Sequence, residues 1–513
     1  MKIDRTKNAT RNIGWGIVEK TISILLPFAT RTVLIKSLGA QYLGLNSLFT
    51  SILQVFSITE LGFGSAIVFS MYKPIAEDDK DTICALLSFY RKTYYIVGSI
   101  ILFAGLAIIP FLPNLVADKN STEVNIYVLY LIYLFNTVLS YYLYAYKEAI
   151  FIAYQRSDLL SKRRLVISFV SSIAQIILLL LFRNYYVYVI VIPCATAATN
   201  IVNAVLSKKM FPDLICTGNI SPKMKEGIKK RIIGLLSFKL YGVVFSSVDT
   251  IVISAFLGLV PLAIYNNYFY VQTSIIGFLS IITASITAGV GNKMITNSVD
   301  ENYKDFMNFT FLNAWLSSWC AICLLVLYQH FMYTWMGKDL VLPFHTMILM
   351  VLYFFLPRVT TMTYTYREAA GLWWEDRIRP LIATVVNLVV NLFLVRIIGM
   401  DGVIISTLIC TVFINVPWGS IILFKNYFKI SPRHYFLRIL TYIAITSVVC
   451  VVTLGVCSVI PDIGWGYLLL KMPVCVVVPN AILWLFLRLF PEYSYAKGLV
   501  TNYAGKLMKR VHG

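Results

Sequence analysis

The stretch 165–182 reads LVISFVSSIAQIILLLLF, and after Arg183 and Asn184 a second apolar stretch, 185–206, reads YYVYVIVIPCATAATNIVNAVL. Each stretch has about the 20 residues that an α-helix needs to cross roughly 30 Å of hydrocarbon. A helix satisfies its own backbone hydrogen bonds, which an open sheet in lipid cannot do. The sequence therefore predicts an all-α polytopic membrane protein with about fourteen transmembrane helices, the other twelve runs being 13–38, 42–71, 93–112, 126–146, 233–257, 262–289, 309–332, 344–366, 381–398, 402–424, 436–460 and 465–489.

Composition supports this reading. The 513 residues are 58% hydrophobic and only 13% charged, with a mean hydropathy of +0.76, whereas soluble domains carry about 25% charged residues. The net charge of +20 does not indicate nucleic acid, because the basic residues lie in short loops between apolar runs. The nine cysteines lie mostly inside apolar runs, and the four histidines form no cluster. No metal and no cofactor is therefore expected.

Basic residues alternate between the loops. The N-terminus and every second loop are rich in Lys and Arg, as in 223–231 (KMKEGIKKR), while the intervening loops hold about one each. The positive-inside rule assigns the rich loops to the cytoplasm. Both termini are then cytoplasmic, the number of spans is even, and the first run is expected to remain as a span because it lacks a cleavage signal.

The chain shows signs of an internal repeat. The segment 144–149 (YAYKEA) matches 364–369 (YTYREA) at an offset of 220, and 31–39 matches 250–258 at an offset of 219. These matches predict two parallel six-helix lobes, residues 1–207 and 233–425, joined by a basic cytoplasmic linker, 208–232. Two further helices and a basic tail occupy 426–513. Transporters are often built from such repeats, with the substrate bound between them.

The first seventy residues carry a family resemblance. Gly39-Ala-Gln-Tyr-Leu-Gly44 and Leu61-Gly-Phe-Gly-Ser-Ala66, with 387–407 later in the chain, resemble the bacterial polysaccharide (O-antigen-type) flippases of the multidrug/oligosaccharidyl-lipid/polysaccharide exporter superfamily. The resemblance implies alternating-access transport of an undecaprenyl-diphosphate-linked oligosaccharide from the inner to the outer leaflet, for O-antigen, capsule or exopolysaccharide synthesis. It implies as partners the lipid-linked oligosaccharide, membrane lipids, and a polymerase and other polysaccharide-assembly proteins.

Charged residues inside the spans are the candidate site residues, because a charge at mid-bilayer costs roughly 2.5–3.5 kcal/mol on insertion scales. Lys20 and Arg31 are eleven residues apart, so they share a helix face. With Lys239 and Arg358 they predict a cationic cavity that binds a diphosphate. The alternative for Arg31 is that it snorkels to the outer membrane interface, and for Lys20 that it snorkels to the inner one or pairs with the neighbouring Glu19.

Two further sets of charges are predicted to serve transport. Asp249 and Glu60 are candidate ion-coupling sites, although Asp249 could equally pair with a nearby lysine. The repeated pairs Lys147-Glu148 and Arg367-Glu368 are candidates for a cytoplasmic gate, and the alternative is plain interfacial anchoring.

Two other functions are alternatives. A drug/cation antiporter of the same fold would favour acidic residues in its cavity, whereas the charges inside the spans are mostly basic. A membrane-embedded polysaccharide polymerase needs a sizeable outer loop with catalytic residues, but the outer loops are short and 113–125 offers only Asp118, Lys119 and Glu123. The sequence therefore favours a carrier over an enzyme.

Overall fold

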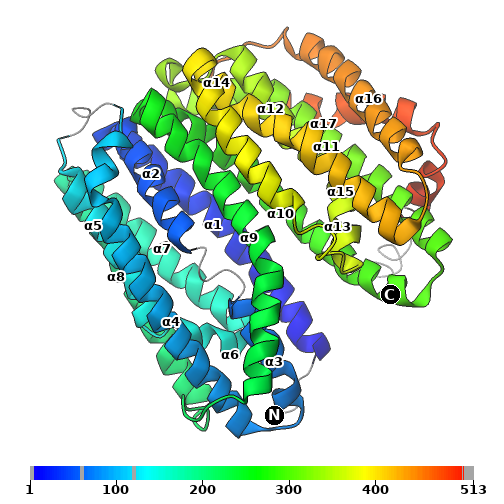
Figure 1. Ribbon diagram of the computed structural model, residues 1–513. Coiled ribbons are helices and arrows are strands. Elements are labelled where there is room, and N and C mark those ends of the chain that lie inside the picture. The colour runs from blue at the N-terminus through cyan, green and yellow to red at the C-terminus, as the bar shows by residue number, and fades with distance from the viewer. Residues whose placement is uncertain (1–4, 58–62, 118–122, 500, 502–513) are drawn as a thin grey trace, which may run out of the picture. The chain divides into compact units, whose positions relative to one another are not determined.

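The computed structural model describes residues 5–57, 63–117, 123–499 and 501; in addition, the side chains of 5–10, 13, 233–241, 244–246, 284, 285, 288, 292 and 295 lie outside the description. The described residues form helices and connecting turns (Figure 1). The α-helices are α1 (Arg5–Leu38), α2 (Ala40–Phe56), α3 (Phe63–Ala76), α4 (Lys80–Ile108), α5 (Ile126–Tyr142), α6 (Glu148–Ala153), α7 (Ser157–Phe182), α8 (Tyr185–Met210), α9 (Pro222–Leu257), α10 (Leu259–Thr296), α11 (Val299–Met336), α12 (Phe344–Val359), α13 (Thr361–Ala369), α14 (Arg379–Ile409), α15 (Val416–Leu423), α16 (Arg433–Cys457) and α17 (Trp465–Leu487). Short 3₁₀ segments are η2 (Ile109–Asn114), η3 (Ala145–Lys147) and η4 (Lys338–Leu340), and π-helical segments are η5 (Cys410–Asn415) and η6 (Phe424–Phe428).

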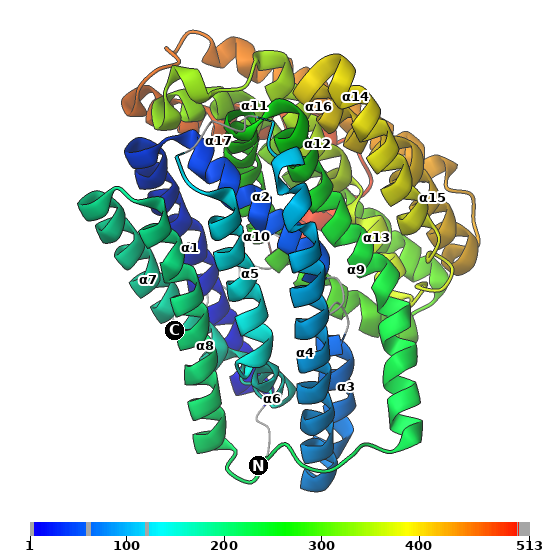
Figure 2. The same ribbon diagram turned by 60° about the vertical axis from the view of Figure 1, so that its left-hand side comes forward.

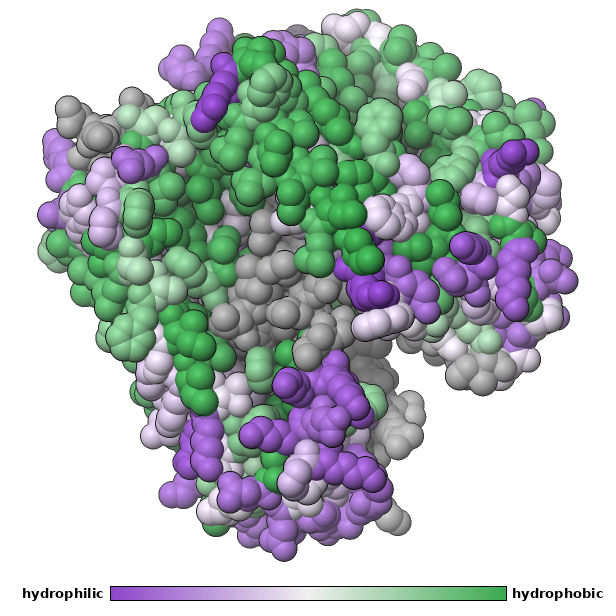
Figure 3. Space-filling view, in the orientation of Figure 1, coloured by the Kyte–Doolittle hydropathy of each residue, from purple (hydrophilic) through white to green (hydrophobic). Residues whose placement is uncertain are grey.

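The chain is a multi-pass all-α membrane protein. Each of the fourteen apolar runs falls on helix in the described residues. Among these residues nine helices are long and apolar enough to cross a membrane, or ten if the bent pair α5–α6 is one span. Much of the face seen in Figure 3 is apolar. Large apolar side chains such as Val170, Leu181 and Phe393 are exposed. The exact number of fourteen crossings stays a prediction.

The helices group into two compact units, residues 1–266 and 267–513. In the first unit α1 packs on α7, α7 on α8, α8 on α5, α5 on α4 and α4 on α3; Figure 2 shows α4, α5, α8 and α7 running side by side. Helix α9 packs on α2 and α3 and so belongs to this unit by its contacts. The lobe boundary at 208–232 was drawn from the repeat in the sequence, and it stays a prediction.

The linker lies against the first unit. Residues 211–221 are not helical, and Ser221 caps α9, which continues through the basic segment 223–231 into the predicted span. Lys80 Nζ lies 2.7 Å from Asp213 Oδ2, and Lys92 Nζ donates to Asn219 Oδ1 at 3.4 Å. The segment therefore follows the start of α4, and its basic end is part of a long helix.

In the second unit α11 is the central helix, because α12, α13, α16 and α17 all pack on it. Polar contacts bind the final two helices to it. The indole of Trp315 donates to Asn480 Oδ1 on α17 at 3.0 Å, and that of Trp319 donates to the carbonyl of Cys475 at 2.9 Å. The hydroxyls of Ser318 and Thr446 join α11 to α16 at 2.6 Å. The two C-terminal helices are thus an integral part of this unit.

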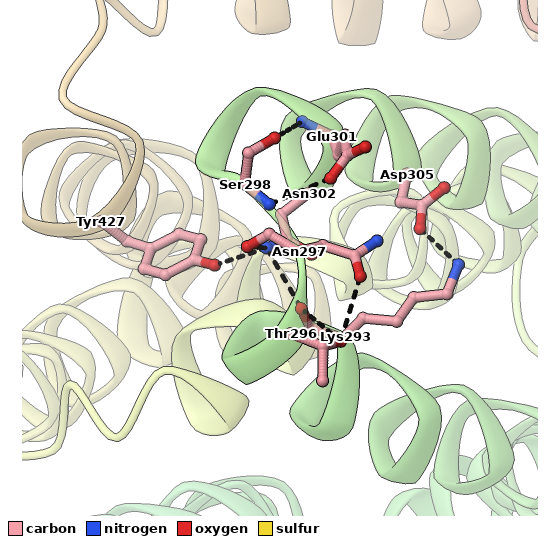
Figure 4. Close-up of polar contacts among 8 residues, drawn as sticks. All are labelled: Lys293, Thr296, Asn297, Ser298, Glu301, Asn302, Asp305 and Tyr427. Carbon is pink, nitrogen blue, oxygen red and sulfur yellow. Dashed lines mark hydrogen bonds and ion pairs between the residues drawn. The ribbon is translucent and has the colours of Figure 1, made fainter.

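A network of polar contacts joins the turn between α10 and α11 to η6 (Figure 4). Ser298 and Glu301 form a capping box at the start of α11. Asn302, the next residue, donates to the hydroxyl of Tyr427 at 3.0 Å, and Lys293 at the end of α10 lies 2.5 Å from Asp305 on α11. These contacts satisfy the helix ends and fix the turn.

The repeated motif coincides with broken helices in both units. In the first unit the chain bends by 48° between α5 and α6, where Tyr144 has φ 61° and its carbonyl accepts from the Lys147 N–H. In the second unit the corresponding run is divided at Thr360 into α12 and α13, and α13 carries residues 364–369. In both units the motif therefore lies at or just after an interruption of the helix.

Candidate functional site

A cavity of about 640 Å³ lies inside the first unit, among α3, α4, α5, α6, α7 and α8. Ligand pockets in proteins occupy roughly 300–1,000 Å³, so this cavity has the size of a binding site. Its polar lining consists of hydroxyls and amides with one carboxylate: Ser57, Tyr90, Tyr94, Asn136, Thr137, Ser140, Tyr141, Glu148, Ser168, Ser171, Gln175, Thr196, Thr199 and Asn200.

The polar residues form stripes along three helices that are otherwise apolar. On α5 the stripe is Asn136 and Ser140, on α7 it is 168, 171 and 175, and on α8 it is 196, 199 and 200. A spacing of three or four residues places each set on one helix face. Thr196 Oγ1 donates to Asn136 Oδ1 at 2.7 Å, and Asn200 Nδ2 donates to the Ser140 carbonyl at 3.5 Å. These bonds hold α8 against α5 with the polar faces turned inward.

A wall of tyrosines closes the side formed by α4 and α5. The hydroxyl of Tyr90 donates to that of Tyr94 at 3.1 Å, and the Tyr94 and Tyr141 rings lie 5.4 Å apart. Gly98 permits this approach, because a Cβ there would lie 2.8 Å from the Cβ of Tyr141. Tyrosine offers an apolar ring face and a polar tip, so this wall can contact both C–H and O–H groups.

Glu148 is one of the residues that line the cavity, and its charge is already compensated. Its Oε1 accepts from Arg163 Nη2 at 3.0 Å and from Asn203 Nδ2 at 3.0 Å, while its Oε2 accepts from Arg164 Nη2 at 2.9 Å. Arg164 also lies 4.0 Å from Glu19 on α1. The carboxylate therefore joins α6, α7 and α8 and does not stand as an isolated negative charge.

Each unit also contains a buried aspartate held by two arginines. In the first unit Asp158 lies 2.9 Å from Arg11 Nε and 3.1 Å from Arg156 Nε, and its N–H donates to Asn12 Oδ1 at 2.8 Å. These contacts tie the start of α1 to the start of α7.

In the second unit Asp376 is fully buried and lies 3.0 Å from Arg367 Nε and 2.6 Å from Arg379 Nε. Each of these two aspartates follows the repeated motif along the chain. Asp158 comes ten residues after Glu148, and Asp376 comes eight residues after Glu368.

The structure brings two of the predicted site residues near one turn of α10. Arg31 Nη1 donates to the carbonyl of Asn266 at 3.3 Å, and the hydroxyl of Tyr265 donates to the buried Asp249 at 3.4 Å. Arg31 on α1 and Asp249 on α9 thus contact successive residues of the same helix. Neither residue lines the 640 Å³ cavity.

The other predicted residues lie elsewhere in the chain or outside the described residues. Lys20 is half-buried on α1 beside Glu19, and Lys147 Nζ lies 5.6 Å from the centre of the Tyr144 ring. Arg358 is half-buried on α12, where its carbonyl accepts from Asn313. Glu60 and the side chain of Lys239 lie outside the described residues.

The motif charges proposed for a gate have partners inside their own units. Glu148 pairs with arginines of α7, and Arg367 pairs with Asp376. Glu368 is half-buried on α13. The gate stays a prediction, and these pairs show that the motif also has a structural role within each unit.

The sequence prediction did not include this cavity, because it rested on charged residues and the cavity is lined mostly by uncharged polar ones. The signal was nevertheless present: hydroxyl and amide residues recur at helical spacing within the apolar runs 126–146, 165–182 and 185–206. A stripe of this kind marks a polar face inside a span. Asp158 and Asp376 were missed because their loops were considered only for their basic residues.

Comparisons with known proteins agree with this architecture. Similar solved structures include an inward-facing multidrug resistance MATE family transporter of the MOP superfamily (13% identity, TM-score 0.59, covering 82% of this chain and 95% of that one). Another is the lipid II flippase MurJ in an inward closed conformation (15% identity, TM-score 0.59, 93% and 98%). A third is a Vibrio cholerae MATE transporter (13% identity, TM-score 0.55, 84% and 98%).

At these identities the likeness concerns the fold, which is that of membrane transporters and flippases. A search of curated protein sequences found no significant match. The model of the family described as "Polysaccharide biosynthesis protein" matches residues 9–288. Because this match covers more than half of the chain, the protein belongs to the polysaccharide biosynthesis protein family.

Proposed function

We propose that this protein is a flippase that moves undecaprenyl-diphosphate-linked oligosaccharides from the inner to the outer leaflet of a bacterial cytoplasmic membrane, by alternating access. The observation that carries the proposal is the family match over 9–288, since the whole lining of the polar cavity falls within that region. The chain thus combines a polysaccharide-family sequence with a hydrophilic chamber inside helices whose outer faces are apolar.

The physical task explains why such a chamber is needed. Moving a hydroxyl from water into hydrocarbon without a hydrogen bond costs roughly 2–7 kcal/mol, depending on the reference state. A sugar carries several hydroxyls, so an unaided crossing is prohibitively slow. Side chains that replace the water around the sugar remove most of that cost. The polyprenyl chain needs no such route, because it is as apolar as the bilayer.

The predicted charges take the following roles in the proposal. Arg31, Lys20, Lys239 and Arg358 bind the diphosphate, because phosphate oxygens pair strongly with guanidinium and ammonium groups. Asp249 and Glu60 couple transport to an ion, and the pairs Lys147-Glu148 and Arg367-Glu368 control the cytoplasmic side. Both termini are cytoplasmic, and a polymerase and other assembly proteins receive the product.

A drug/cation antiporter is the second candidate, because MATE transporters share the fold. Glu148 is the acidic residue in the described lining of the cavity, but two arginines and an amide occupy its oxygens. A cationic drug would have to displace those partners. This observation favours the lipid-linked sugar over a cation, and it offers nothing to a polymerase, which needs an activated nucleophile or base.

The proposal is tested in proteoliposomes that contain the purified full-length protein. The substrate is undecaprenyl diphosphate carrying a neutral disaccharide, and its exposure on the outer leaflet is measured with a lectin that cannot cross the membrane. We expect flipping well above that of protein-free vesicles. A rate equal to that of empty vesicles, with the protein folded, would refute the proposal.

The cationic-cavity part is tested with Arg31→Ala, with Lys36→Ala as control because Lys36 is an exposed cation on the same helix. We expect Arg31→Ala to reduce the flipping rate and Lys36→Ala to leave it unchanged. Equal rates for the two variants would show that Arg31 serves only to anchor α1.

A further inference from the structure

We infer that the cavity inside the first unit binds the uncharged, hydroxyl-bearing sugars of the lipid-linked substrate, separately from the diphosphate. This inference rests on the proposed function and adds to it a place and a chemistry for sugar recognition. The site is the 640 Å³ cavity whose polar lining comes mainly from α4, α5, α7 and α8.

The charge of the cavity excludes a phosphate as its natural occupant. Among the described residues that line it, none is Lys, Arg or His, and Glu148 is the single acid. Glu148 would repel an anion, while its own charge is taken up by Arg163, Arg164 and Asn203. A neutral ligand is what this balance favours, since neither an anion nor a cation finds an uncompensated partner.

The hydrogen-bonding groups fit a ligand that both donates and accepts. Thr196 donates to Asn136 Oδ1, which orients the amide and leaves its Nδ2 hydrogens as donors. Ser171 donates to the carbonyl of Ile167 at 2.6 Å, so its hydroxyl oxygen remains able to accept. Gln175, one turn further along α7, offers both kinds of group. Sugar hydroxyls need such a mixture.

The tyrosine wall supplies the second feature of a sugar site. Tyr90, Tyr94 and Tyr141 line the cavity, and their rings contact one another, with centroids 4.6 Å apart for Tyr90 and Tyr94 and 5.4 Å apart for Tyr94 and Tyr141. The faces of a pyranose ring carry C–H groups that pack on aromatic rings, while its rim carries the hydroxyls. A cavity of about 640 Å³ that is lined by both aromatic and amide side chains therefore suits a mono- or disaccharide.

The experiment compares the binding of two lipids to the full-length protein in nanodiscs. One probe is undecaprenyl diphosphate with a neutral hexose disaccharide, and the other is bare undecaprenyl diphosphate. The variants are Asn136→Leu and Gln175→Leu, which keep side-chain volume but remove the amide. The control is Asn480→Leu on α17, an amide that bonds to Trp315 and does not line the cavity.

We expect each cavity variant to weaken the binding of the disaccharide lipid about three- to tenfold, which corresponds to one lost net hydrogen bond. Binding of bare undecaprenyl diphosphate should stay within twofold, and Asn480→Leu should alter neither. Equal affinities of wild type and both variants for the disaccharide lipid, or equal losses for both lipids, would overturn the inference. If one variant fails to fold, the other still decides.

The flipping assay separates this inference from the proposed function. A protein that flips the disaccharide lipid but ignores both substitutions refutes the sugar site alone. A protein that shows the selective loss of binding but does not flip the lipid refutes the flippase and keeps the sugar site. If binding is lost only when sodium in the buffer is replaced by potassium, or potassium by sodium, the cavity is a cation site and the inference is overturned.

Discussion

Replacing Asp376 by alanine should strongly destabilise the second unit. Asp376 is fully buried, and its carboxylate accepts from Arg379 Nε at 2.6 Å and Nη2 at 2.7 Å and lies 3.0 Å from Arg367 Nε. Both arginine side chains are at most 7% exposed. Removal of the carboxylate leaves two guanidinium groups close together with little water; Arg379 keeps a hydrogen bond to Asn415, and Arg367 keeps its contact with the Tyr364 ring.

The magnitude follows from the burial. Removing one partner of a buried ion pair costs about 3–5 kcal/mol, because the remaining charge is desolvated and uncompensated. For a folding unit of this size, 1 kcal/mol corresponds to a change in Tm of about 2–4 °C. We therefore expect Asp376→Ala to lower Tm by about 6–20 °C. Asp376→Asn should fall between wild type and Asp376→Ala, since an amide oxygen still accepts.

The assay is thermal unfolding of the detergent-solubilised protein, followed by intrinsic fluorescence. The control is Asp213→Ala, because Asp213 pairs with Lys80 at 2.7 Å but both side chains are more than half exposed. An exposed pair contributes about 0–1 kcal/mol, so this control should lose at most a few degrees. If the two variants lower Tm by the same amount, the ion pairs around Asp376 do not stabilise the unit and the reasoning is refuted.

Three further predictions use the same assay or a related one. Gly419→Ala should destabilise by about 1–3 kcal/mol, because a Cβ there collides with the Arg367 guanidinium; a Tm equal to wild type would show that Arg367 moves aside freely. Gly44→Ala should destabilise the protein by a similar amount, because a Cβ there would meet the backbone carbonyl of Leu259. The yield of folded protein in membranes should fall accordingly. Asp79→Ala should speed hydrogen exchange in the first turn of α4, because Asp79 accepts from the N–H and hydroxyl of Thr82. These bonds lower the pKa of Asp79, so the cap acts above the ordinary carboxylate pKa of about 4 and is lost as the pH falls through the lowered pKa; unchanged exchange at neutral pH would contradict it.

The sequence predicted the helices well because hydrophobicity dominates inside a bilayer. The fourteen apolar runs all fall on helix in the described residues, and no knowledge of packing was needed for that. Where each helix breaks could not be read in the same way. The bend between α5 and α6 depends on the left-handed backbone of Tyr144, a conformation that the letters YAYKEA do not specify.

The candidate site was only partly predictable, for a reason that concerns charge. Basic residues near span ends were interpreted as signals for topology, which is their average role. Arg11 and Arg163 have a second role, since Arg11 on α1 holds Asp158 on α7 and Arg163 on α7 holds Glu148 on α6. Such pairing depends on tertiary contacts, because the two residues of the Arg163–Glu148 pair lie on different helices, fifteen positions apart.

The arrangement in the first unit suggests why one transporter would separate its polar groups by charge. Arg31 lies near the α10 turn at 265–266, whereas the cavity among α4, α5, α7 and α8 is neutral. A diphosphate needs cations, but a cation beside a neutral sugar gains little and must be desolvated. Hydroxyls and amides each donate and accept, and a hydroxyl can rotate, so such side chains can adjust to sugars whose hydroxyls are placed differently. A carrier built in this way would hold the invariant diphosphate by charge and tolerate variation in the sugar, so that a change of sugar should alter affinity far less than removal of the diphosphate.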